Sequence, residues 1–517
     1  MRDAYQVATV RAAERALMDL VPDGALMQKA AAGLVSVCAA LLRREPGFVY
    51  GARVAVLAGS GDNGGDALYA GALLARRGAA VIAITAGPKT HQGGLTALRA
   101  AGGRVTSQTS TASQTTMTGQ ASTAGQADPI GRADLIIDGL LGIGGRGGLR
   151  EPFAGLAARA ERARQDGATV VAVDLPSGID ADTGTVDGPA VRADVTVTFG
   201  TLKPGLLVDP GAGHAGTVEL VDIGLAPHLP DQPDAAAPQR DDIRALLPRP
   251  GAESDKYRRG VLGLLAGSDR YTGAALLSAG GAVHGGAGMV RMVTADVPAA
   301  LVRQAWPETV VSAHPDDPDW DLPGSVGRVQ AWTAGPGMGT DAGAVARLAA
   351  IVRTDLPVLV DADGLTILSQ HRNLLPRNAP TLITPHAGEL ARLLGVDPSD
   401  VEARRIEHAR RAAAELGVTV LLKGSTTVIA APGGGPVLVN PTGTPWLATA
   451  GSGDVLSGLA GALLAQGLAP AQAGLAAAYL HGLAGRLAAA PDGPGADAAP
   501  IGASDLVRAL PAAFRSL

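Results

Sequence analysis

Trp446-Leu-Ala-Thr-Ala-Gly-Ser-Gly-Asp454 places a flexible glycine turn and one carboxylate directly before a long apolar helix, which the sequence predicts over residues 455–464. An anion bound at this turn would meet free backbone N–H groups and the positive end of a helix dipole. A single dipole contact contributes only about 0.3–1 kcal/mol, whereas micromolar binding of a nucleotide needs roughly 8 kcal/mol. The turn therefore predicts an anion site that must include residues from elsewhere in the chain.

Three polar segments upstream are the candidates, because each follows a short apolar run typical of a buried strand. They are Asp361-Ala-Asp363-Gly, Thr384-Pro-His386-Ala-Gly-Glu389 and Lys423-Gly424-Ser425-Thr426-Thr427. In an open α/β sheet, ligands bind outside the carboxyl ends of the strands. We therefore expect these segments and the Asp454 turn to lie at one edge of a sheet.

Continuous runs of Val, Ile and Leu also mark the first half of the chain. They lie at residues 54–58, 81–85, 135–138, 169–174 and 195–199, and a helical pattern at residues 67–77 separates the first two. Runs without polar alternation predict strands covered on both faces, and hence a parallel sheet between helices. A second series begins at Val261. The predicted fold class is α/β with two domains, of which the first is a Rossmann-like doubly wound parallel sheet.

Domain boundaries follow from composition, because 517 residues are too many for one ordinary core. Residues 226–250 are rich in proline and have no apolar period, so they are predicted to link domains at residues 1–225 and 251–517. Residues 107–127 contain no charged residue. Such a segment cannot bury enough apolar surface to order itself, so we predict a disordered surface insertion there.

A glycine loop in the first half, Gly59-Ser-Gly61-Asp62-Asn63-Gly64, satisfies the pattern of dinucleotide-binding proteins. That fingerprint also needs an acidic residue about 20 positions later for the ribose hydroxyls. No Asp or Glu occurs between Asp66 and Asp128, which argues against a standard dehydrogenase.

Short polar side chains nevertheless gather at three strand ends in this half. The segments are Asp62-Asn63-Gly64-Gly65-Asp66, the Asp138 strand end with Gly142-Ile143-Gly144-Gly145-Arg146-Gly147-Gly148, and Asp174-Leu-Pro-Ser177. Converging oxygen ligands of this kind suit a hard cation. The alternative is that the glycine turns only connect strands and the aspartates cap helices.

Charge and cysteine content limit the partners and the compartment. With 43 basic and 48 acidic residues and a net charge of −5, no field favours nucleic acid or an anionic membrane. The single Cys38 cannot form an internal disulfide, which fits a reducing compartment and a buried apolar role on a helix. No signal peptide is apparent, and we expect a cytoplasmic protein. No metal-ligand spacing of His or paired Cys predicts a zinc site.

The second half resembles the C-terminal dehydratase of the bifunctional NAD(P)H-hydrate repair enzymes, which has a ribokinase-like fold. The motifs that carry the resemblance over residues 251–510 are Gly267-Ser-Asp-Arg-Tyr-Thr-Gly-Ala274, Gly335-Pro-Gly-Met-Gly339, DADGL from Asp361, TPHAGE, KGSTT and GSGDVLSG. The resemblance implies dehydration of the S hydrate with ADP or ATP and Mg²⁺. The implied hydrate contacts are Ala274, Gly337, Gly339, His386 and Asp454, and the implied nucleotide contacts are Lys423, Gly424, Ser425, Thr426, Thr427 and Gly453.

Hydroxide is a poor leaving group, and transfer of a phosphoryl group to its oxygen turns it into a good one. The hydroxyl must lose a proton as it attacks the phosphoryl group, and Asp454 is the candidate general base that takes this proton. Its place beside a helix N-terminus predicts that the carboxylate stays ionised. Three structural roles remain as alternatives: a helix N-cap for Asp454, a solvated strand-end lysine for Lys423 and a structural role for His386.

Residues 8–225 resemble the epimerase domain of the same enzymes, with its NNGGDG loop, its strand ending in Asp and its D-x-P-S-G loop. The resemblance implies potassium contacts from Asn63, Asp138 and Ser177, and catalytic roles for Asp138 and Asp174. It also implies hydrate contacts from residues 62–66, residues 142–148 and Asp174. Three departures from the family pattern bear on the substrate contacts: Asp62 replaces an Asn, Ala67 replaces a Gly, and Leu26-Met-Gln-Lys-Ala-Ala31 replaces LMENAG.

The resemblance therefore implies a bifunctional enzyme that epimerises R and S hydrates and dehydrates the S form, and we expect a homo-oligomer. Two rival interpretations remain. A small-molecule kinase for a vitamin precursor would share the second fold, and the first domain could be a non-catalytic binding module of the kind found in mRNA-decapping scaffolds. The retained Asp138, Asp174 and Ser177 speak against the binding module.

Overall fold

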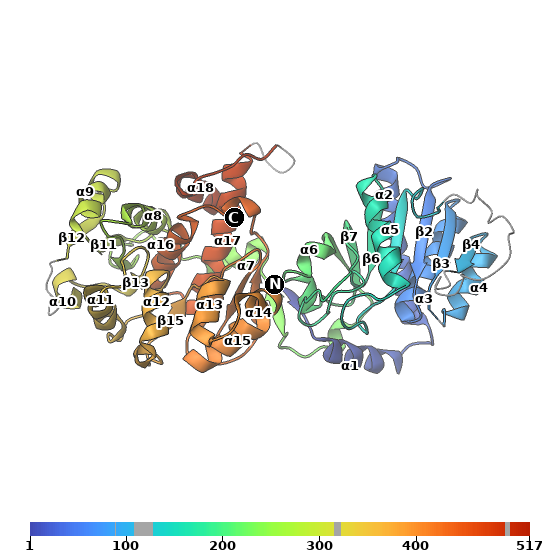
Figure 1. Ribbon diagram of the computed structural model, residues 1–517, viewed down its shortest axis with the longest axis horizontal. Coiled ribbons are helices and arrows are strands. Elements are labelled where there is room, and N and C mark those ends of the chain that lie inside the picture. The colour runs from blue at the N-terminus through green and yellow to red at the C-terminus, as the bar shows by residue number, and fades with distance from the viewer. Residues whose placement is uncertain (88, 108–127, 315–321, 492–496) are drawn as a thin grey trace, which may run out of the picture. The chain divides into compact units, whose positions relative to one another are not determined.

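The computed structural model describes residues 1–87, 89–107, 128–314, 322–491 and 497–517, and it divides into two compact units (Figure 1). The first unit is Asp3–Asp234, and the second unit is Ala235–Leu517 together with Met1–Arg2. Apart from Ser107, the predicted disordered insertion at residues 107–127 lies outside the described residues.

The first unit is built on a seven-stranded sheet in the order β4-β3-β2-β5-β6-β7-β8, and every neighbouring pair is parallel. The strands are β2 (Arg53–Ala58), β3 (Ala80–Thr85), β4 (Arg104–Ser107), β5 (Leu135–Gly139), β6 (Thr169–Val173), β7 (Val195–Phe199) and β8 (Thr217–Val221). The helices are α1 (Val7–Met18), α2 (Ala25–Arg44), α3 (Asp62–Arg76), α4 (Gln92–Ala100), α5 (Phe153–Gln165), α6 (Ala212–Ala215), η1 (Pro204–Leu206) and η2 (Ala226–His228).

Both faces of this sheet are covered, as the continuous apolar runs predict. Along β2, Val54 and Val56 pack into a core cluster that includes residues of α1–α4, whereas Ala55 and Leu57 pack into a second cluster that includes residues of α5. Successive strand residues point to opposite faces, so an apolar residue is needed at every position. The doubly wound parallel sheet predicted for this half is confirmed.

The second unit is built on a mixed sheet in the order β1-β9-β18-β17-β16-β15-β14-β13-β10-β11-β12. The strands are β1 (Arg2–Ala4), β9 (Ala235–Ala237), β10 (Val261–Leu265), β11 (Met289–Thr294), β12 (Val310–Ala313), β13 (Ala331–Ala334), β14 (Val358–Val360), β15 (Thr381–Ile383), β16 (Thr419–Leu422), β17 (Thr427–Ala430) and β18 (Val437–Asn440). From β16 to β12 all pairs are parallel, whereas β17 runs antiparallel to both of its neighbours.

The helices of the second unit include α8 (Thr272–His284) and α16 (Ser452–Ala465), which pack closely against each other (Figure 1). A Cβ at Gly281 would lie 2.2 Å from the Val455 carbonyl oxygen, so only glycine allows this approach. The others are α7 (Arg240–Leu246), α9 (Asp296–Ala305), α10 (Leu322–Val326), α11 (Ala342–Val352), α12 (Asp363–Gln370), α13 (Ala387–Leu394), α14 (Pro398–Ala403), α15 (Arg405–Leu416), α17 (Pro470–Ala489), α18 (Ala503–Arg515), η3 (Arg372–Leu374) and η4 (Pro445–Leu447).

The prediction that residues 226–250 form a linker is wrong for the middle of that segment. Residues 235–237 form β9, which pairs with β18, and residues 240–246 form α7. The Met1 ammonium lies 2.7 Å from an oxygen of Asp242. A short Ala-Ala-Ala strand has no periodicity that sequence could reveal, and its pairing partner lies about 200 residues away along the chain. The division between the units therefore falls after Asp234.

Among the described residues, α2 is the one helix that is long and apolar enough to cross a bilayer, by length and composition only. The core helix of a soluble protein passes the same test. Leu34, Cys38 and Leu42 of this helix are completely buried in the core of the first unit. The buried Cys38 confirms the predicted apolar role, and burial raises the pKa of its thiol to about 12.

Each sheet contains a point where the strand order reverses. In the first unit the chain passes from β2 outward to β4 and then returns to the other side of β2 at β5. In the second unit it passes from β10 to β12 and returns at β13. Ligands bind beside such points, outside the carboxyl ends of the strands. The predicted site residues in both halves follow strands at these edges.

Candidate active sites

A cavity of about 970 Å³ opens in the first unit at the reversal between β2 and β5. The predicted residues that line it are Asp62, Asn63, Asp66, Gly142, Ile143, Gly144, Gly145 and Asp174. Of the remaining predictions for this half, Gly64 and Gly65 lie within the first turn of α3, and Arg146, Gly147 and Gly148 do not line the cavity. Residues 146–148, which are predicted to contact the hydrate, therefore lie outside the lining of this cavity.

The segment predicted as a glycine loop is the first turn of a helix. Helix α3 begins at Asp62, five residues earlier than predicted, with Gly61 as its N-cap. A Cβ at Gly64 would lie 2.4 Å from the Gly59 carbonyl oxygen, which explains the glycine. Ala67, where the family has glycine, fits because Gly139 opposite it has no side chain: a Cβ there would lie 2.5 Å from that of Ala67.

Asp138 is completely buried at the end of β5 and is held by Ser177. The backbone N–H of Ser177 donates to Asp138 Oδ2 at 2.8 Å, and the Ser177 hydroxyl donates to Oδ1 at 2.7 Å. Burial raises the pKa of Asp138 to about 6 against the lowering effect of these hydrogen bonds. Within the described residues no cation lies within salt-bridge distance of this carboxylate.

Asn63 is the third residue predicted to bind potassium, and its side chain is 8% exposed. Its Nδ2 is buried without a hydrogen-bond partner in the described structure. The side chain lies against the loop after β5, since a Cβ at Gly142 would be 3.1 Å from Asn63 Oδ1. A buried amide lacking a partner and a buried carboxylate lacking a counter-ion are costly unless something compensates them. The Asp138 carboxylate fits a bound monovalent cation, which Asn63 would contact through Oδ1, because its Nδ2 is a hydrogen-bond donor.

Asp174 reaches the same cavity with its backbone in the left-handed region, at φ 63°. It contacts Lys203, a lysine that is 1% exposed and that sequence analysis missed. A buried lysine has no periodicity or spacing that reveals it. Lysines are almost never fully buried unless they are paired, so the burial of Lys203 becomes evident only from the tertiary structure.

Helices α1 and α2 supply further cavity residues that sequence reasoning missed. Arg11, Glu14 and Arg15 come from α1, and residues 25–28 come from the start of α2. Arg11, Glu14 and Arg15 are spaced so that they lie on one face of a helix. This spacing is the feature of the sequence that could have identified them as a charged cluster. Arg11 and Arg15 are the only Lys or Arg residues among the described residues that line the cavity.

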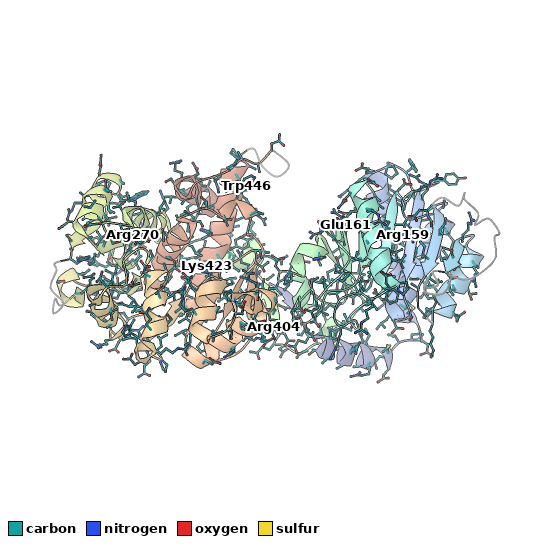
Figure 2. The ribbon with its side chains drawn as sticks, viewed as in Figure 1. Arg159, Glu161, Arg270, Arg404, Lys423 and Trp446 are labelled. Atoms are coloured by element: carbon teal, nitrogen blue, oxygen red, sulfur yellow. The ribbon has the colours of Figure 1, made fainter. Side chains whose placement is uncertain are left out.

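In the second unit, Asp361 at the end of β14 lies at the centre of a charged network. It is 2% exposed, and its Oδ1 accepts from the ammonium of Lys423 at 2.7 Å. Its Oδ2 accepts from the hydroxyl of Ser457 on α16 at 2.6 Å. Lys423, labelled in Figure 2, is therefore not the solvated strand-end lysine that sequence alone allowed. Burial lowers the pKa of Lys423, but Asp361, Glu389 and Asp454 outweigh it and raise the pKa.

Asp454 is the third residue of α16, and Gly451 with φ 86° occupies the N-cap. The N-cap alternative for Asp454 is therefore wrong. The prediction that the carboxylate stays ionised is also wrong, because burial and the charge of Asp361 raise its pKa to about 7, against the lowering effect of Lys423. The helix dipole contributes only about 0.3–1 kcal/mol, which does not offset desolvation. A carboxyl group that titrates near neutrality suits general-base catalysis.

The side chain of Lys423 lies close to the backbone of the Asp454 turn. A Cβ at Gly453 would lie 3.5 Å from Lys423 Nζ. On the other side of the turn, His481 of α17 lies 2.9 Å from the Ser452 carbonyl oxygen through its Nε2. His481 is 7% exposed, and burial lowers its pKa to about 4. A neutral imidazole thus fixes the first residue of α16, which sequence analysis did not identify.

His386 is exposed and caps α13. Its Nδ1 accepts from the backbone N–H of Gly388 at 3.0 Å, and the backbone N–H of His386 donates to Glu389 Oε2 at 2.8 Å. Glu389 lies 4.0 Å from Lys423 Nζ, so the His386 turn adjoins the Asp361 network. His386 therefore has a structural role and also remains available to a ligand, because its side chain is 59% exposed.

The glycine turn at residues 335–339 is tied to the same network. The Gly339 N–H donates to Asp363 Oδ2 at 2.9 Å. A Cβ at Gly337 would lie 2.7 Å from that of Ala274, so these two predicted residues are neighbours. Gly335 passes so close to Asp361 that a Cβ would lie 1.8 Å from the Asp361 carbonyl oxygen. The structure thus places the predicted hydrate contacts around one site.

Of the nucleotide contacts predicted at residues 423–427, residues 423–426 lie in the turn between β16 and β17, and Thr427 is the first residue of β17. Gly424 and Ser425 are exposed, whereas Thr426 and Thr427 are partly buried. The turn is supported by Arg405, whose guanidinium donates to the Lys423 carbonyl oxygen at 2.6 Å. A Cβ at Gly424 would lie 2.1 Å from this guanidinium. These residues form an exposed polar turn beside Lys423, as a phosphate-binding segment requires.

Comparison with known proteins shows which family each half of the chain matches. A family model described as NAD(P)H-hydrate dehydratase matches residues 262–505, and one described as YjeF-related protein N-terminus matches residues 23–205. The ADP/ATP-dependent NAD(P)H-hydrate dehydratase of Bacillus subtilis, co-crystallized with ATP and Mg²⁺, is 32% identical and covers 54% of this chain and 97% of its own, with a TM-score of 0.48.

Two curated relatives match along nearly their whole length. The bifunctional NAD(P)H-hydrate repair enzyme of Moorella thermoacetica is 35% identical over 96% of this chain and 93% of its own. That of Mycobacterium leprae is 48% identical over 100% of both chains. The chain therefore belongs to the family of bifunctional NAD(P)H-hydrate repair enzymes.

Proposed function

We propose that this chain repairs hydrated nicotinamide nucleotides, with epimerisation of the R and S hydrates in the first unit and nucleotide-dependent dehydration of the S hydrate in the second. The observation that carries the proposal is the joint presence of two built sites. One is the acidic cavity of the first unit, and the other is the Asp361 network beside the Asp454 turn. Near-full-length similarity to bifunctional relatives supports both halves.

In the second unit, Asp454 takes the proton from the hydroxyl of the hydrate as that oxygen attacks the terminal phosphoryl group of the nucleotide. The phosphate then leaves together with the former hydroxyl oxygen, and loss of a ring proton restores the dihydronicotinamide. Lys423 offsets charge on the phosphates, while residues 424–427, of which Gly424 and Ser425 are exposed, offer N–H and hydroxyl donors. The pKa of about 7 lets Asp454 act as a base at neutral pH.

The second site also fits Mg²⁺. The carboxyl groups of Asp361, Glu389 and Asp454 all interact with the single Lys423, and Asp363 adds a fourth carboxyl group close enough to act on Asp454. Hard carboxylate oxygens are the ligands that Mg²⁺ prefers, and it is usually held by one or two of them plus substrate phosphates. Both oxygens of Asp361 are already used, so Asp363 is the residue we expect to hold it. When bound, the ion supplies charge neutralisation on the phosphate oxygens. ADP and ATP remain alternatives as the donor.

The first unit also fits potassium. Asn63, Asp138 and Ser177 would hold the ion, and it would compensate the buried carboxylate of Asp138. Its role would be to keep the loops after β2, β5 and β6 in place rather than to take part in proton transfer. Arg11 and Arg15, the only Lys or Arg among the described residues lining the cavity, would receive the phosphates of the dinucleotide.

One assay tests both activities. Purified protein is given mixed R and S hydrates with Mg²⁺ and either ADP or ATP, and recovery of reduced-nicotinamide absorbance is followed. Complete recovery requires both activities, whereas recovery of only the S fraction at the enzymatic rate requires dehydration alone. Release of a phosphorylated organic product would favour the small-molecule kinase instead. A cytoplasmic location and a homo-oligomeric state stay predictions.

A further inference from the structure

Lys203 forms a buried ion pair beside the cavity of the first unit. Its ammonium lies 2.5 Å from Asp174 Oδ1, 3.0 Å from the hydroxyl of Thr198 and 3.2 Å from the Phe199 carbonyl oxygen. An ammonium has three N–H donors, so all of them are used. A lysine that is 1% exposed and fully satisfied is held in one position, and its charge is directed at Asp174.

The contacts of Asp174 are confined to one of its two oxygens. Lys203, the Thr198 hydroxyl at 3.0 Å and the Phe199 N–H at 3.3 Å all donate to Oδ1. Within the described part of the chain, Oδ2 has no hydrogen-bond partner, and Asp174 lines the cavity. One oxygen is therefore anchored and the other is left for a ligand.

The backbone of Asp174 has an unusual conformation that fits this arrangement. With φ at 63°, it is one of two described residues other than glycine in the left-handed region. Such conformations are unfavourable and persist where the surroundings determine them, which is common at active sites. The pairing of Asp174 N–H with the Val197 carbonyl oxygen at 2.7 Å holds the residue there.

Other charged groups around Asp174 are mostly acidic. Asp62 and Asp66 come from α3, and Glu14 and Arg11 come from α1. Burial, together with the charges of Asp174, Asp62 and Glu14, raises the pKa of Asp66 well above its usual value. The surroundings of Asp66 therefore favour its protonated form, whereas Asp174 is the carboxyl group that has a buried lysine as its partner.

We propose that Lys203 is a positioning residue that anchors Asp174 through Oδ1 and leaves Oδ2 free for the substrate, and that Asp66 is the proton donor that works with it. The proposal rests on the epimerase function proposed above and assigns an acid and a base to that reaction.

The chemistry requires one acid and one base. The hydroxyl of the hydrate lies on a ring carbon next to the ring nitrogen. Asp66 donates its proton to this hydroxyl, the C–O bond breaks with release of water, and the nitrogen lone pair forms a C=N⁺ bond. Water then adds to the opposite face, the π pair returns to nitrogen, and Asp174 Oδ2 takes the released proton. Exchange of protons with solvent restores both groups, and the reverse reaction uses them in opposite roles.

The test is the pH profile of epimerisation, measured by coupling to an excess of a separate dehydratase. Lys203→Met should lower kcat roughly 10²-fold near pH 7 with little change in KM, and the acidic limb of the profile should move to higher pH, because Asp174 has lost its cation. Lys203→Arg should restore part of the activity. Lys89→Met, at an exposed lysine that does not line the cavity, is the matched control and should leave the profile unchanged.

Two further variants decide the matter if Lys203→Met does not fold. Thr198→Val removes one neutral donor to Oδ1 and should shift the acidic limb in the same direction with a smaller loss. Asp66→Asn should abolish the limb at higher pH and lower kcat. An unchanged profile in Lys203→Met or, failing that, in Thr198→Val would overturn the positioning role. If the parent protein dehydrates S hydrate but never epimerises, the proposed function fails instead.

Discussion

Asp361 and Lys423 are joined by a 2.7 Å contact between the carboxylate Oδ1 and the ammonium Nζ, and this pair links the ends of two parallel strands, β14 and β16. The pair sets the charge around Asp454, because Asp361 raises the pKa of Asp454 and Lys423 lowers it. Glu389 adds a second carboxylate within 4.0 Å of Lys423. The properties of the proposed base therefore depend on residues that are distant in sequence.

Replacement of Asp454 by Asn should abolish dehydration while leaving epimerisation intact. Loss of a general base costs roughly 10²-fold or more in kcat, and the proposed epimerase residues belong to the other unit. Single-turnover dehydration of S hydrate, with epimerisation of R hydrate as the internal control, measures the effect. Near-normal dehydratase turnover would mean that this carboxylate has no role as a base.

The same substitution should change how stability depends on pH. The folded-state pKa of Asp454 is about 7 against an ordinary value of 3.8, so the folded protein binds this proton more tightly than the unfolded chain. Stability from this group is therefore lost as pH rises from about 4 to 7. Asp454→Asn does not titrate, so its Tm relative to the parent should rise between pH 5 and pH 8. A constant difference in Tm would contradict the raised pKa.

Asp361→Asn should move the pH profile of dehydration. Removal of the Asp361 charge takes away one cause of the raised pKa of Asp454, while Lys423 remains to lower it. The acidic limb of kcat/KM should therefore shift to lower pH, with a loss of activity from the disturbed Lys423. Asp341→Asn, at an exposed N-cap of α11, serves as the control. A limb that stays in place would show that Asp361 does not act on Asp454.

Epimerisation should depend on potassium through Asp138. Dialysis into a buffer with tetramethylammonium as the only cation should lower the epimerase rate and leave the Asp138 carboxylate uncompensated, and potassium should restore the rate. Asp138→Ala should lower epimerisation strongly and remove the response to potassium, while the second unit still dehydrates S hydrate. Equal epimerase rates with both cations in the parent protein would count against the potassium site.

Arg11 and Arg15 should govern binding rather than turnover in the first unit. Each neutral replacement, Arg11→Gln or Arg15→Gln, should raise KM for the hydrate roughly 10- to 150-fold with little effect on kcat, because a charge-assisted hydrogen bond contributes about 1.5–3 kcal/mol. Arg76→Gln, at an exposed position of α3 outside the cavity, is the matched control. Steady-state kinetics with both R hydrates would distinguish pyrophosphate binding from 2′-phosphate binding, since only NADPH hydrate carries the latter.

Fragments divided after Asp234 should fold better than fragments divided inside the former linker. A C-terminal fragment that begins at Ala235 retains β9 and α7, whereas one that begins at Arg249 loses both. The longer fragment should dehydrate S hydrate and melt at a higher temperature than the shorter one. Equal melting temperatures would mean that β9 adds little to the second unit.

Sequence alone determined the fold class, the two halves and most of the residues at each strand end. Short continuous apolar runs separated by helical patterns indicate strands covered on both faces, and parallel strands bring their carboxyl ends to one edge. The positions of Asp361, Lys423 and Asp454, and of Asp138 and Asp174, followed from that rule. Glycine patterns also marked the close approaches at Gly64 and Gly335 without revealing what approached.

Only the tertiary structure decided which charges lie together and how they titrate. Burial and neighbouring carboxylates, rather than the helix dipole, set the pKa of Asp454, because desolvation outweighs a weak dipole contact. The buried Lys203, the contributions of α1 to the cavity and the pairing of β9 depend on contacts between distant segments. Such contacts have no local sequence signal, since they arise from packing of the whole unit.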